Sequence, residues 1–474
     1  MKRAASSTTG ASAEEEYGKS ESDPLIDSNN KQAHTVRRSR WYHTSFVIMA
    51  EVMGAGILGL PYATVRLGLV LGVVTSVCCG LAAWYAGWLL SRVKHEFSCT
   101  SDAESYAGMA AALVGPLFGS FTKGIIAFSW AMMLPFFLLT AVDSIKLLFP
   151  EASLATWHYA VLLVCVLIFP AQLRSLHELS YLSLPSVICI IATVVIIIMD
   201  AVVHGGPSRG PAALPLHTTH HHHLLGMATL AEVPVTMPAT VSAWPAPGTS
   251  VFRLFGEVNA FTFAYLGHSI YLELMREMSD STQFGNTALP VANAIMVLCY
   301  TGTALVCVYT MGAQVGGFLP DSMSDGPAKR AVGALLVLHM LVSLLVTGQP
   351  LHRQLHHWAF PSTADTSGPH AAVHWLLITA STLTFSLLVV LAVPFFEPFQ
   401  TLLGALVGAP SLFGYPAFFF LRASHKAGKP LRFVDAALCW TYLVVLTPLF
   451  VIFGTAHSLM TISDSWAIVR ATTP

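Results

Sequence analysis

Charged residues are scarce in this chain. Asp, Glu, Lys and Arg make up 10% of its 474 residues, against 54% hydrophobic residues, whereas an ordinary soluble domain carries about 25% charged residues. This composition excludes a water-soluble globular protein and predicts a membrane protein. The formal net charge of -1 indicates neither an acidic nor a basic partner, and nothing in the sequence points to nucleic acid.

Signatures of enzyme and metal chemistry are also missing. We find no nucleophile motif, phosphate-binding loop or metal triad, and no CxxC spacing. Among the eight cysteines only Cys99 falls in an evident loop, so no pair presents itself as an external disulfide. The N-terminal 40 residues are polar and lack the short apolar core of a cleavable signal peptide. We therefore expect a protein that is not an enzyme and that needs neither a cofactor nor a metal.

Long apolar runs dominate the sequence instead. Crossing a bilayer takes roughly 20 apolar residues, and eleven runs are candidates, the fourth being short because it contains Pro170. They are Ser45–Val65, Leu67–Leu90, Phe121–Phe149, Tyr159–Leu173, Leu182–Val203, Leu254–Met275, Pro290–Phe318, Ala331–Pro350, Val373–Phe396, Phe399–Leu421 and Phe433–Phe453. We expect an all-α polytopic membrane protein with a disordered cytosolic tail over 1–42, a transmembrane domain over 43–458 and a C-terminal tail over 459–474.

Basic residues indicate how the chain crosses the membrane. They gather in the N-terminal 40 residues, in the loops after the second, fourth, sixth and eighth segments, and in the 422–432 loop. Cytosolic loops of membrane proteins carry this excess of Lys and Arg. We therefore expect the N-terminus in the cytosol and, after an odd number of crossings, the C-terminus on the opposite side.

Two of the apolar segments are interrupted by glycine and polar residues. The first contains Gly54-Ala55-Gly56, and glycine is a poor helix former. The sixth, five segments later, contains Gly256-Glu257 and Gly267-His268. In lipid, an open helix is tolerated only where its backbone lines a cavity or binds something. Helices broken at matching positions of two halves indicate the binding site of an inverted-repeat transporter, although glycines also serve close helix packing.

The sequence around these interruptions resembles the amino acid/auxin permease family. The resemblance is carried by "EVMGAGILGLPYATVRLGLVLG" and "FTFAYLGHSIYLELMREMSD" in the first and sixth segments. It continues in "SYAGMAAALVGPLFG", "PAQLRSLHELSYLSLPSV" and "VPFFEPFQTLLGALVGAPSLFGYPAFFFLRA". These motifs stand in the family's order and cover the chain from Trp41 to Phe453.

This resemblance implies the five-plus-five inverted-repeat fold of the bacterial leucine transporter, with eleven helices. Repeat one would span 43–203 and repeat two 254–421, and the eleventh helix would span 433–458. Members of the family are secondary transporters of amino acids, driven mostly by protons and in some branches by sodium. A sensor of the same fold, which binds an amino acid without moving it, is the alternative from another class.

An amino acid zwitterion would be held mainly by backbone groups. Its carboxylate needs donors, which the amides of Gly54, Ala55, Gly56 and Ile57 would supply at the start of a half-helix. Its ammonium group needs acceptors, which carbonyl groups in the opened sixth helix would supply. The residues expected there are Phe263, Ala264 and Tyr265, and Trp130 and Met133 of the third segment are further candidates for contacting the substrate side chain. An interior poor in charge favours neutral amino acids.

Glu51 is the first candidate for coupling transport to an ion. A carboxyl group in hydrocarbon faces a cavity, pairs or carries a proton. The resemblance adds that sodium-coupled members have asparagine just before the Gly-x-Gly, whereas this chain has Ala50 followed by Glu51, so we favour protons. His268 is a second candidate, or a satisfied interior histidine. A sodium site at Ser343 and Thr347 stays open as the alternative, since hydroxyls at that spacing often bond only to their own helix.

Two segments outside the apolar runs carry further signals. The loop over 204–252 holds His217 and His220–His223, a tract that binds transition metals in some proteins, but we expect a low-complexity insertion without a role in transport. In the N-terminal tail, Glu21, Leu25 and Ile26 fit the acidic dileucine pattern that sorting adaptors bind. The pattern favours an endolysosomal or vacuolar membrane over the plasma membrane.

Overall fold

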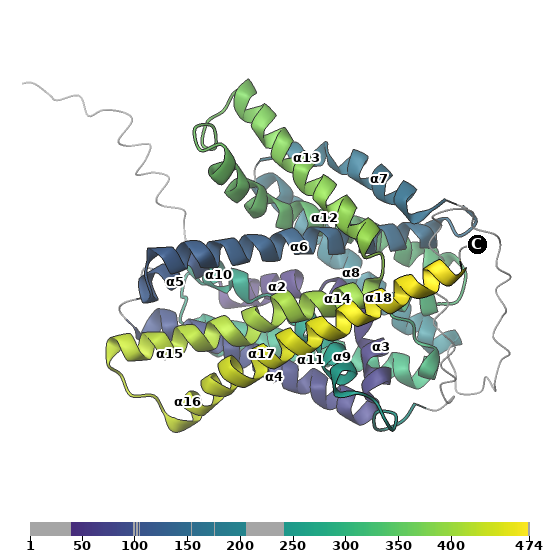
Figure 1. The fold of residues 1–474 in the computed structure, drawn as a ribbon, viewed down its shortest axis with the longest axis horizontal. Helices are drawn as coiled ribbons and strands as arrows, with labels where there is room; N and C mark the ends of the chain where they lie inside the picture. The colour runs from purple at the N-terminus through teal and green to yellow at the C-terminus, as the bar shows by residue number, and fades with distance from the viewer. Residues whose placement is uncertain are drawn as a thin grey trace, which may run out of the picture. The chain divides into compact units, whose positions relative to one another are not determined.

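The computed structural model describes residues 39–204 and 241–472, apart from 98–99, 101–102, 104, 153 and 175, and gives the backbone alone for 176–183 and 472. The predicted sorting signal at Glu21, Leu25 and Ile26 and the histidine tract of the long loop lie outside the described residues. The part that is described consists of helices joined by turns and loops (Figure 1).

Eight helices of the described chain are long and apolar enough to cross a membrane, and a ninth span results if the bent pair Trp41–Val52 and Ala55–Leu67 is counted as one. Two of the eleven predicted segments fall short of this measure. The fourth forms only the 12-residue helix Thr156–Leu167, and the sixth is divided into helices of 14 and 7 residues. The model thus describes a multi-pass helical membrane protein.

The α-helices have the following bounds: α2 Trp41–Val52, α3 Leu60–Leu67, α4 Leu69–Glu96, α5 Tyr106–Leu113, α6 Pro116–Leu148, α7 Thr156–Leu167, α8 Leu176–His204, α9 Val251–Ala264, α10 Tyr271–Glu277, α11 Leu289–Met311, α12 Pro327–Ala359, α13 Pro369–Ala392, α14 Phe396–Leu403, α15 Tyr415–Ala427, α16 Phe433–Trp440, α17 Thr447–Leu449 and α18 Thr455–Thr472. The short 3-10 helices are η1 Ala55–Gly59, η3 Pro170–Gln172, η4 His268–Ile270, η6 Gly312–Gln314 and η7 Leu319–Ser322. Single π-helical stretches are η5 Phe284–Ala288, η8 Gly404–Gly408, η9 Pro410–Gly414, η10 Thr441–Leu446 and η11 Phe450–Gly454.

Gly-Pro pairs begin three of the long spans, one of them α12, which starts at Pro327 after Gly326. Helix α6 starts at Pro116 after Gly115, whose φ is 140°, and α13 starts at Pro369 after Gly368, whose φ is 148°. Proline suits the first helical position because an N–H group there would have no acceptor within the helix, so nothing is lost by its absence. Glycine adopts the positive φ that the preceding turn requires. These pairs set where each span enters the bundle.

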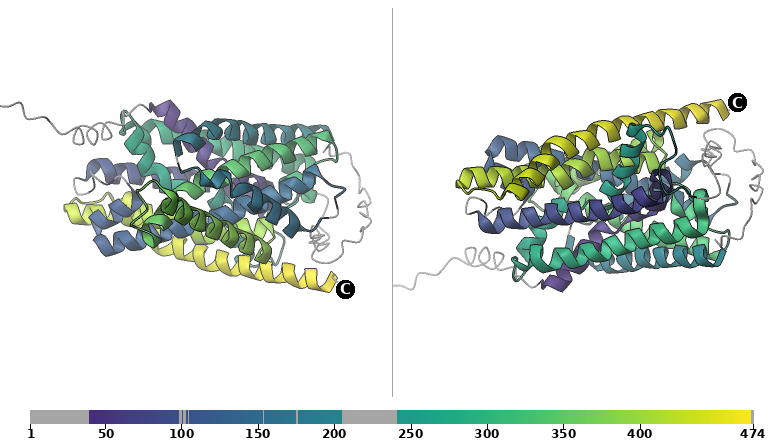
Figure 2. Two further views of the ribbon diagram at one scale, coloured as in Figure 1. Left: turned by 90° about the horizontal axis from the view of Figure 1, so that it is seen from above. Right: turned by 90° about the horizontal axis from the view of Figure 1, so that it is seen from below.

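Two groups of helices pack closely. Helix α12 packs along α6, α8 and α13, while α4 packs along α11 and α15. Helix α9 lies against α14 and η8, and α3 connects α9 to α11. The yellow helix α18 runs along one edge of the bundle (Figure 2), and the best membrane-spanning window of Phe433–Ala471 is only 17% buried.

The last helix differs from the sequence prediction. The apolar run predicts an end at Phe453 and a separate tail over 459–474, but α18 continues to Thr472. No glycine or proline stands between Thr455 and Thr472 to stop it. The helix of the fourth segment ends earlier than predicted. It stops at Leu167, ahead of the helix-breaking Pro170, whereas the apolar run continues to Leu173.

Gly404 offers a test of the packing between α9 and η8. A methyl group on Gly404 would lie 2.0 Å from the backbone oxygen of Asn259, so Gly404→Ala forces two helix backbones apart. We expect it to lower the free energy of unfolding by about 1–3 kcal/mol or more, measured by thermal melting of the detergent-solubilised protein. The matched control is Gly302→Ala on α11, where a methyl group meets nothing within 4 Å. Equal melting of both variants would contradict this packing.

Candidate functional site

The predicted break in the first segment is present. Helix α2 ends at Val52, Met53 and Gly54 leave helical geometry, and η1 begins at Ala55. The two halves are bent by 52° from each other. At the start of η1 the amides of Ala55 and Gly56 have no partner within that helix, as at any helix N-terminus. The sequence prediction of an opened helix at these glycines is confirmed.

The sixth segment is broken as predicted. Helix α9 ends at Ala264, and η4 and α10 continue the chain only from His268. The carbonyl groups at the end of α9 include those of Phe263 and Ala264. The carbonyl of Phe263 accepts from the backbone amides of Tyr265 and Leu266, while that of Ala264 is bonded from another helix.

The two breaks lie directly against each other. A methyl group on Gly56 would lie 2.9 Å from the Cα of Ala264 and 3.4 Å from the ring of Phe263. Glycine at this position is therefore required by a backbone approach that any side chain would prevent. The predicted substrate-binding residues of the first segment thus meet Phe263 and Ala264 of the sixth. The ring of Phe263 packs on Phe136 of α6, at 4.8 Å between centroids, and the contacts predicted between the substrate and Trp130 or Met133 stay a prediction.

Tyr265, the third predicted residue of the sixth segment, directs its side chain toward α11 and α4. The ring packs edge-on against Tyr300 of α11, with centroids 5.0 Å apart. Its hydroxyl lies toward α4, 3.1 Å from where a methyl group on Gly80 would stand. The side chain therefore supports the break from the far side of the backbone.

Tyr300 joins the ends of both broken helices. Its buried hydroxyl lies 3.2 Å from the carbonyl oxygen of Val52, the last residue of α2, and 2.9 Å from that of Ala264, the last residue of α9. One hydroxyl hydrogen is shared between two carbonyl acceptors. The sequence analysis missed this residue because a tyrosine inside an apolar run carries no sign of its partners.

Gln400 performs a similar task on the other half of the first segment. Its buried side-chain amide donates to the carbonyl oxygen of Gly56 at 2.9 Å. Its amide oxygen packs against Gly59, where a methyl group would come within 2.1 Å of it. Helix α14 is thereby held to η1. A polar residue within the tenth apolar run was the available sequence signal.

His339 of α12 is the third residue, after Tyr300 and Gln400, that was not predicted from the sequence. Its Nδ1 lies 2.7 Å from the hydroxyl oxygen of Ser186 on α8, and its Nε2 is buried without a hydrogen-bond partner. A methyl group on Gly54 would lie 3.7 Å from this Nε2 and would meet no other non-neighbouring atom within 4 Å. The position in front of Gly54 therefore has room for a methyl group, which would be in van der Waals contact with His339 Nε2, and we call this position the open space at Gly54.

The predicted coupling residues occupy different surroundings. Glu51 is exposed on α2, one turn before Gly54. His268 is buried, with Nε2 2.9 Å from the carbonyl oxygen of Ala83 and Nδ1 without a partner. Ser343 donates to the carbonyl oxygen of His339, one turn earlier on its own helix, at 2.9 Å, and Thr347 is half-buried one turn further along. Among the described residues no group of three or more His, Cys, Asp and Glu could hold a metal ion.

An ion pair links α3, the second half of the first broken segment, to α9, the first half of the sixth. Arg66, at the end of α3, lies 3.4 Å from the carboxylate of Glu257 on α9, and that carboxylate side chain is 2% exposed. The guanidinium group of Arg66 also lies over the ring of Tyr62, 5.4 Å from its centroid. The buried carboxylate is thus paired, as a buried charge must be to offset its desolvation.

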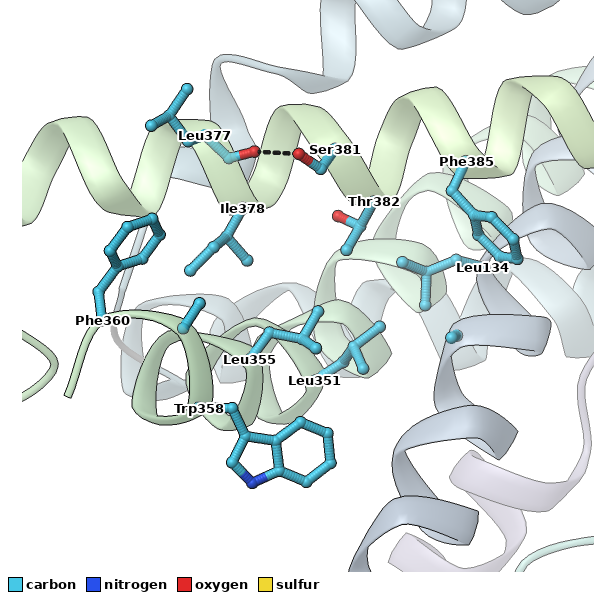
Figure 3. A pocket seen from close by; sticks show the side chains of 12 residues that line it. Leu134, Leu351, Leu355, Trp358, Phe360, Leu377, Ile378, Ser381, Thr382 and Phe385 are labelled. Carbon is cyan, nitrogen blue, oxygen red and sulfur yellow. Dashed lines mark hydrogen bonds between the residues drawn. The ribbon is translucent and has the colours of Figure 1, made fainter.

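A separate cavity of about 590 Å³ lies between α6, α12 and α13. Its lining is mostly apolar and includes Leu134, Leu351 and Phe385 (Figure 3). The hydroxyl of Ser381 donates to the carbonyl oxygen of Leu377, and that of Thr382 pairs with His352. The cavity offers no charged partner to a zwitterion and contains none of the predicted site residues.

Tyr300→Phe tests the link between the two breaks. Removing the hydroxyl takes the side-chain donor from the carbonyl oxygen of Ala264 and leaves that of Val52 with the Gly54 amide alone, which costs about 1–3 kcal/mol of unfolding free energy. We expect a lower melting temperature in detergent and loss of most solute movement in proteoliposomes. Tyr309→Phe, at a 77% exposed tyrosine of the same helix, is the control and should behave as the unmodified protein. If the two variants melt alike, Tyr300 does not secure the breaks.

Comparison with known proteins gives consistent matches. Residues 37–460 match the family model described as transmembrane amino acid transporter protein. The chain is 21% identical over 424 residues to lysine histidine transporter-like 4 of Arabidopsis thaliana, covering 85% of this chain and 84% of that protein. It is 25% identical over 406 residues to amino acid transporter AVT1C of the same plant, and this match covers 83% of this chain and 64% of that protein. Among solved structures, the manganese transporter of Eremococcus coleocola matches with a TM-score of 0.44 at 13% identity, covering 92% of this chain and 88% of that one.

Proposed function

Because this chain belongs to the transmembrane amino acid transporter family, we propose that it moves neutral amino acids together with protons, by alternating access around the two broken helices. The observation that carries this proposal is the contact between the breaks, where Gly56 meets Ala264 beside open space at Gly54. The amide end of η1 and the carbonyl end of α9 meet at this one place, and the Ala264 carbonyl, which already accepts from Tyr300, has a second lone pair.

The geometry suits a zwitterion bound largely by backbone. The amides of Ala55 and Gly56 would receive the carboxylate at the N-terminus of η1, whereas those of Gly54 and Ile57 already donate to the carbonyl oxygens of Val52 and Gly54. The carbonyl end of α9, at Phe263 and Ala264 with Tyr265 following, would receive the ammonium group. Such an arrangement recognises what all amino acids share and leaves selection to the surrounding side chains.

The surroundings of Gly54 favour a neutral substrate. No Asp, Glu, Lys or Arg atom stands within 4 Å of a methyl group placed there, and the Glu257 carboxylate on α9 is paired with Arg66 through one oxygen. A cationic or anionic side chain would bring a charge without a partner into the bundle, which is costly.

We place eleven crossings in two inverted repeats of five, followed by the eleventh helix. In this arrangement α7 and the pair α9 with α10 are the two crossings that are too short to count by length alone. The breaks in the first and sixth crossings support the pairing of 43–203 with 254–421, because broken helices at matching positions mark such repeats. The N-terminus would lie in the cytosol. The sorting signal at Glu21, Leu25 and Ile26 would direct the protein to an endolysosomal or vacuolar membrane.

Protons are the favoured coupling ion. The hydroxyl of Ser343 is engaged with its own helix, which weakens the sodium site proposed with Thr347. Titratable groups stand close to the first break instead, with Glu51 one turn away on α2 and His339 across the open space. A sodium-coupled transporter, or a sensor that binds without transport, is the alternative.

Uptake into proteoliposomes tests the proposal. With an inward proton gradient we expect labelled alanine or leucine to accumulate above its equilibrium level, because proton re-entry drives the substrate with it. An imposed sodium gradient at equal pH should give equilibration only. Accumulation driven by sodium would move the coupling to Ser343 and Thr347, and substrate binding without uptake would support the sensor.

Gly54→Ala tests the position of the substrate. The methyl group enters open space, so we expect little loss of stability, but it occupies room that the substrate needs. The KM should rise by about tenfold, equivalent to about 1.4 kcal/mol of binding. Gly124→Ala on α6, where the methyl group meets nothing within 4 Å, is the control and should keep the normal KM. An unchanged KM in Gly54→Ala would place the substrate elsewhere.

A further inference from the structure

His339 stands out among the buried polar groups because of what its free nitrogen faces. Only 3% of the residue is exposed, one nitrogen is engaged with Ser186 and the other has no partner. Leaving a buried polar atom unpaired costs about 1–3 kcal/mol, so such an atom calls for an explanation. The open space at Gly54 supplies one, since a ligand there would reach Nε2.

Two other buried histidines lack this setting. His268 also has a nitrogen without a partner, but it follows the second break, where its ring packs 4.8 Å from that of Tyr271. His352, three turns along α12 from His339, bonds through Nε2 to the Thr382 hydroxyl at 2.7 Å. Its Nδ1 lies against Gly348 of its own helix. Of these three histidines, His339 alone borders the open space at the first break.

Resting on the transport function proposed above, we infer that His339 carries the coupled proton and, once protonated, donates its Nε2–H to the carboxylate of the amino acid at Gly54. The side chain therefore binds both transported species at one atom. The proton comes from the water on the loading side and leaves to the water on the release side. No bond other than the N–H bond forms or breaks.

The bond to Ser186 prepares the imidazole for this role. With the serine hydroxyl directed at the carbonyl oxygen of His339, 3.5 Å away, Nδ1 is the nitrogen that donates to the serine oxygen. Nε2 then keeps its lone pair and is free to accept a proton. After protonation both ring nitrogens are donors, one toward Ser186 and one toward the substrate.

Coupling follows from the mutual dependence of the two ligands. A charged imidazole buried without an anion is costly, so protonation is favoured when the carboxylate is present. A neutral imidazole would turn its lone pair toward the carboxylate, so substrate binding is favoured when the proton is present. Each ligand then raises the affinity for the other by the same factor.

Few other titratable groups stand near enough to compete. Helix α2 contributes Glu51, and α8 contributes the Cys189 thiol one turn from Ser186. Asp143 of α6 is paired with Lys146 at 2.8 Å, toward the Gly333 end of α12. The remaining described groups on elements packed against α12 lie nearer its ends, and they are Lys123 on α6, Asp200 and His204 on α8, Asp321 on η7, and His370 and His374 on α13.

Substitution of His339 by glutamine tests the inference, because glutamine retains an amide donor but takes up no proton. Three variants are compared in proteoliposomes with the unmodified full-length protein, and they are His339→Gln, His352→Gln and Glu51→Gln. Proton-driven accumulation of labelled alanine and exchange of alanine at equal pH are measured for each. Exchange requires substrate binding and alternating access, but no net release of a proton.

We expect the proton-driven accumulation of His339→Gln to fall by about tenfold more than its exchange does, within the usual range of coupling between two ligands. Its uptake should also lose the pH dependence between roughly 5 and 8 that a histidine confers. His352→Gln, with a histidine equally deep in the same helix, should resemble the unmodified protein. A His339→Gln protein that accumulates alanine normally would overturn the inference, and loss in Glu51→Gln alone would assign the proton to Glu51.

Two further outcomes are separable. If the unmodified protein accumulates alanine without a proton gradient, the proposed proton coupling fails, and the inference fails with it. If His339→Gln loses exchange as well, Ser186→Ala decides, because it keeps the imidazole and removes only the acceptor of Nδ1–H. Half-maximal driven uptake should then move to lower pH, since the charged imidazole has lost a hydrogen bond, and an unchanged pH profile would refute the role of His339.

Discussion

The close approach of Gly56 to Ala264 is the constraint from which the rest of the central structure follows. At this point two helix backbones come together with no side chain between them, and both helices are open there. Opening a helix in an apolar bundle leaves amides and carbonyls that must be paired or given a ligand. The neighbouring helices are arranged around that requirement.

A small number of polar side chains pairs most of the backbone groups that the two breaks leave open. Tyr300 serves the carbonyl ends of α2 and α9 together, and Gln400 serves the carbonyl of Gly56. Each comes from a different helix, so each hydrogen bond also fixes the position of a whole span against the breaks. The amide end of η1 receives no comparable side chain from these residues, and the open space at Gly54 lies beside it. Pairing is thus nearly complete on the carbonyl side, while the amide side is left for an anionic group.

The sequence predicts the breaks well and their partners poorly, for physical reasons. Glycine lowers helix stability wherever it stands, so Gly54 and Gly56 could be interpreted locally. Tyr300, Gln400 and His339 act through contacts with distant segments, and a single polar residue in an apolar run does not show which face of its helix it occupies. Helix ends show the same limit. Hydropathy marks the hydrocarbon region, whereas α18 continues to Thr472 with no glycine or proline to stop it, and α7 ends ahead of Pro170.

Tyr265 and Ser343 show how a correct segment can still mislead about a side chain. Tyr265 follows the break as predicted, yet its ring packs against Tyr300 and away from Gly56. Ser343 lies on the predicted helix, yet its hydroxyl bonds to the carbonyl of His339. Each side chain therefore helps to hold another residue in position, Tyr265 holding Tyr300 and Ser343 holding the backbone of His339. A bundle with so few polar groups uses many of them to hold another in place. Several buried polar atoms of the described residues still lack a hydrogen-bond partner, and among them His339 Nε2 is the one that faces the Cβ position of Gly54.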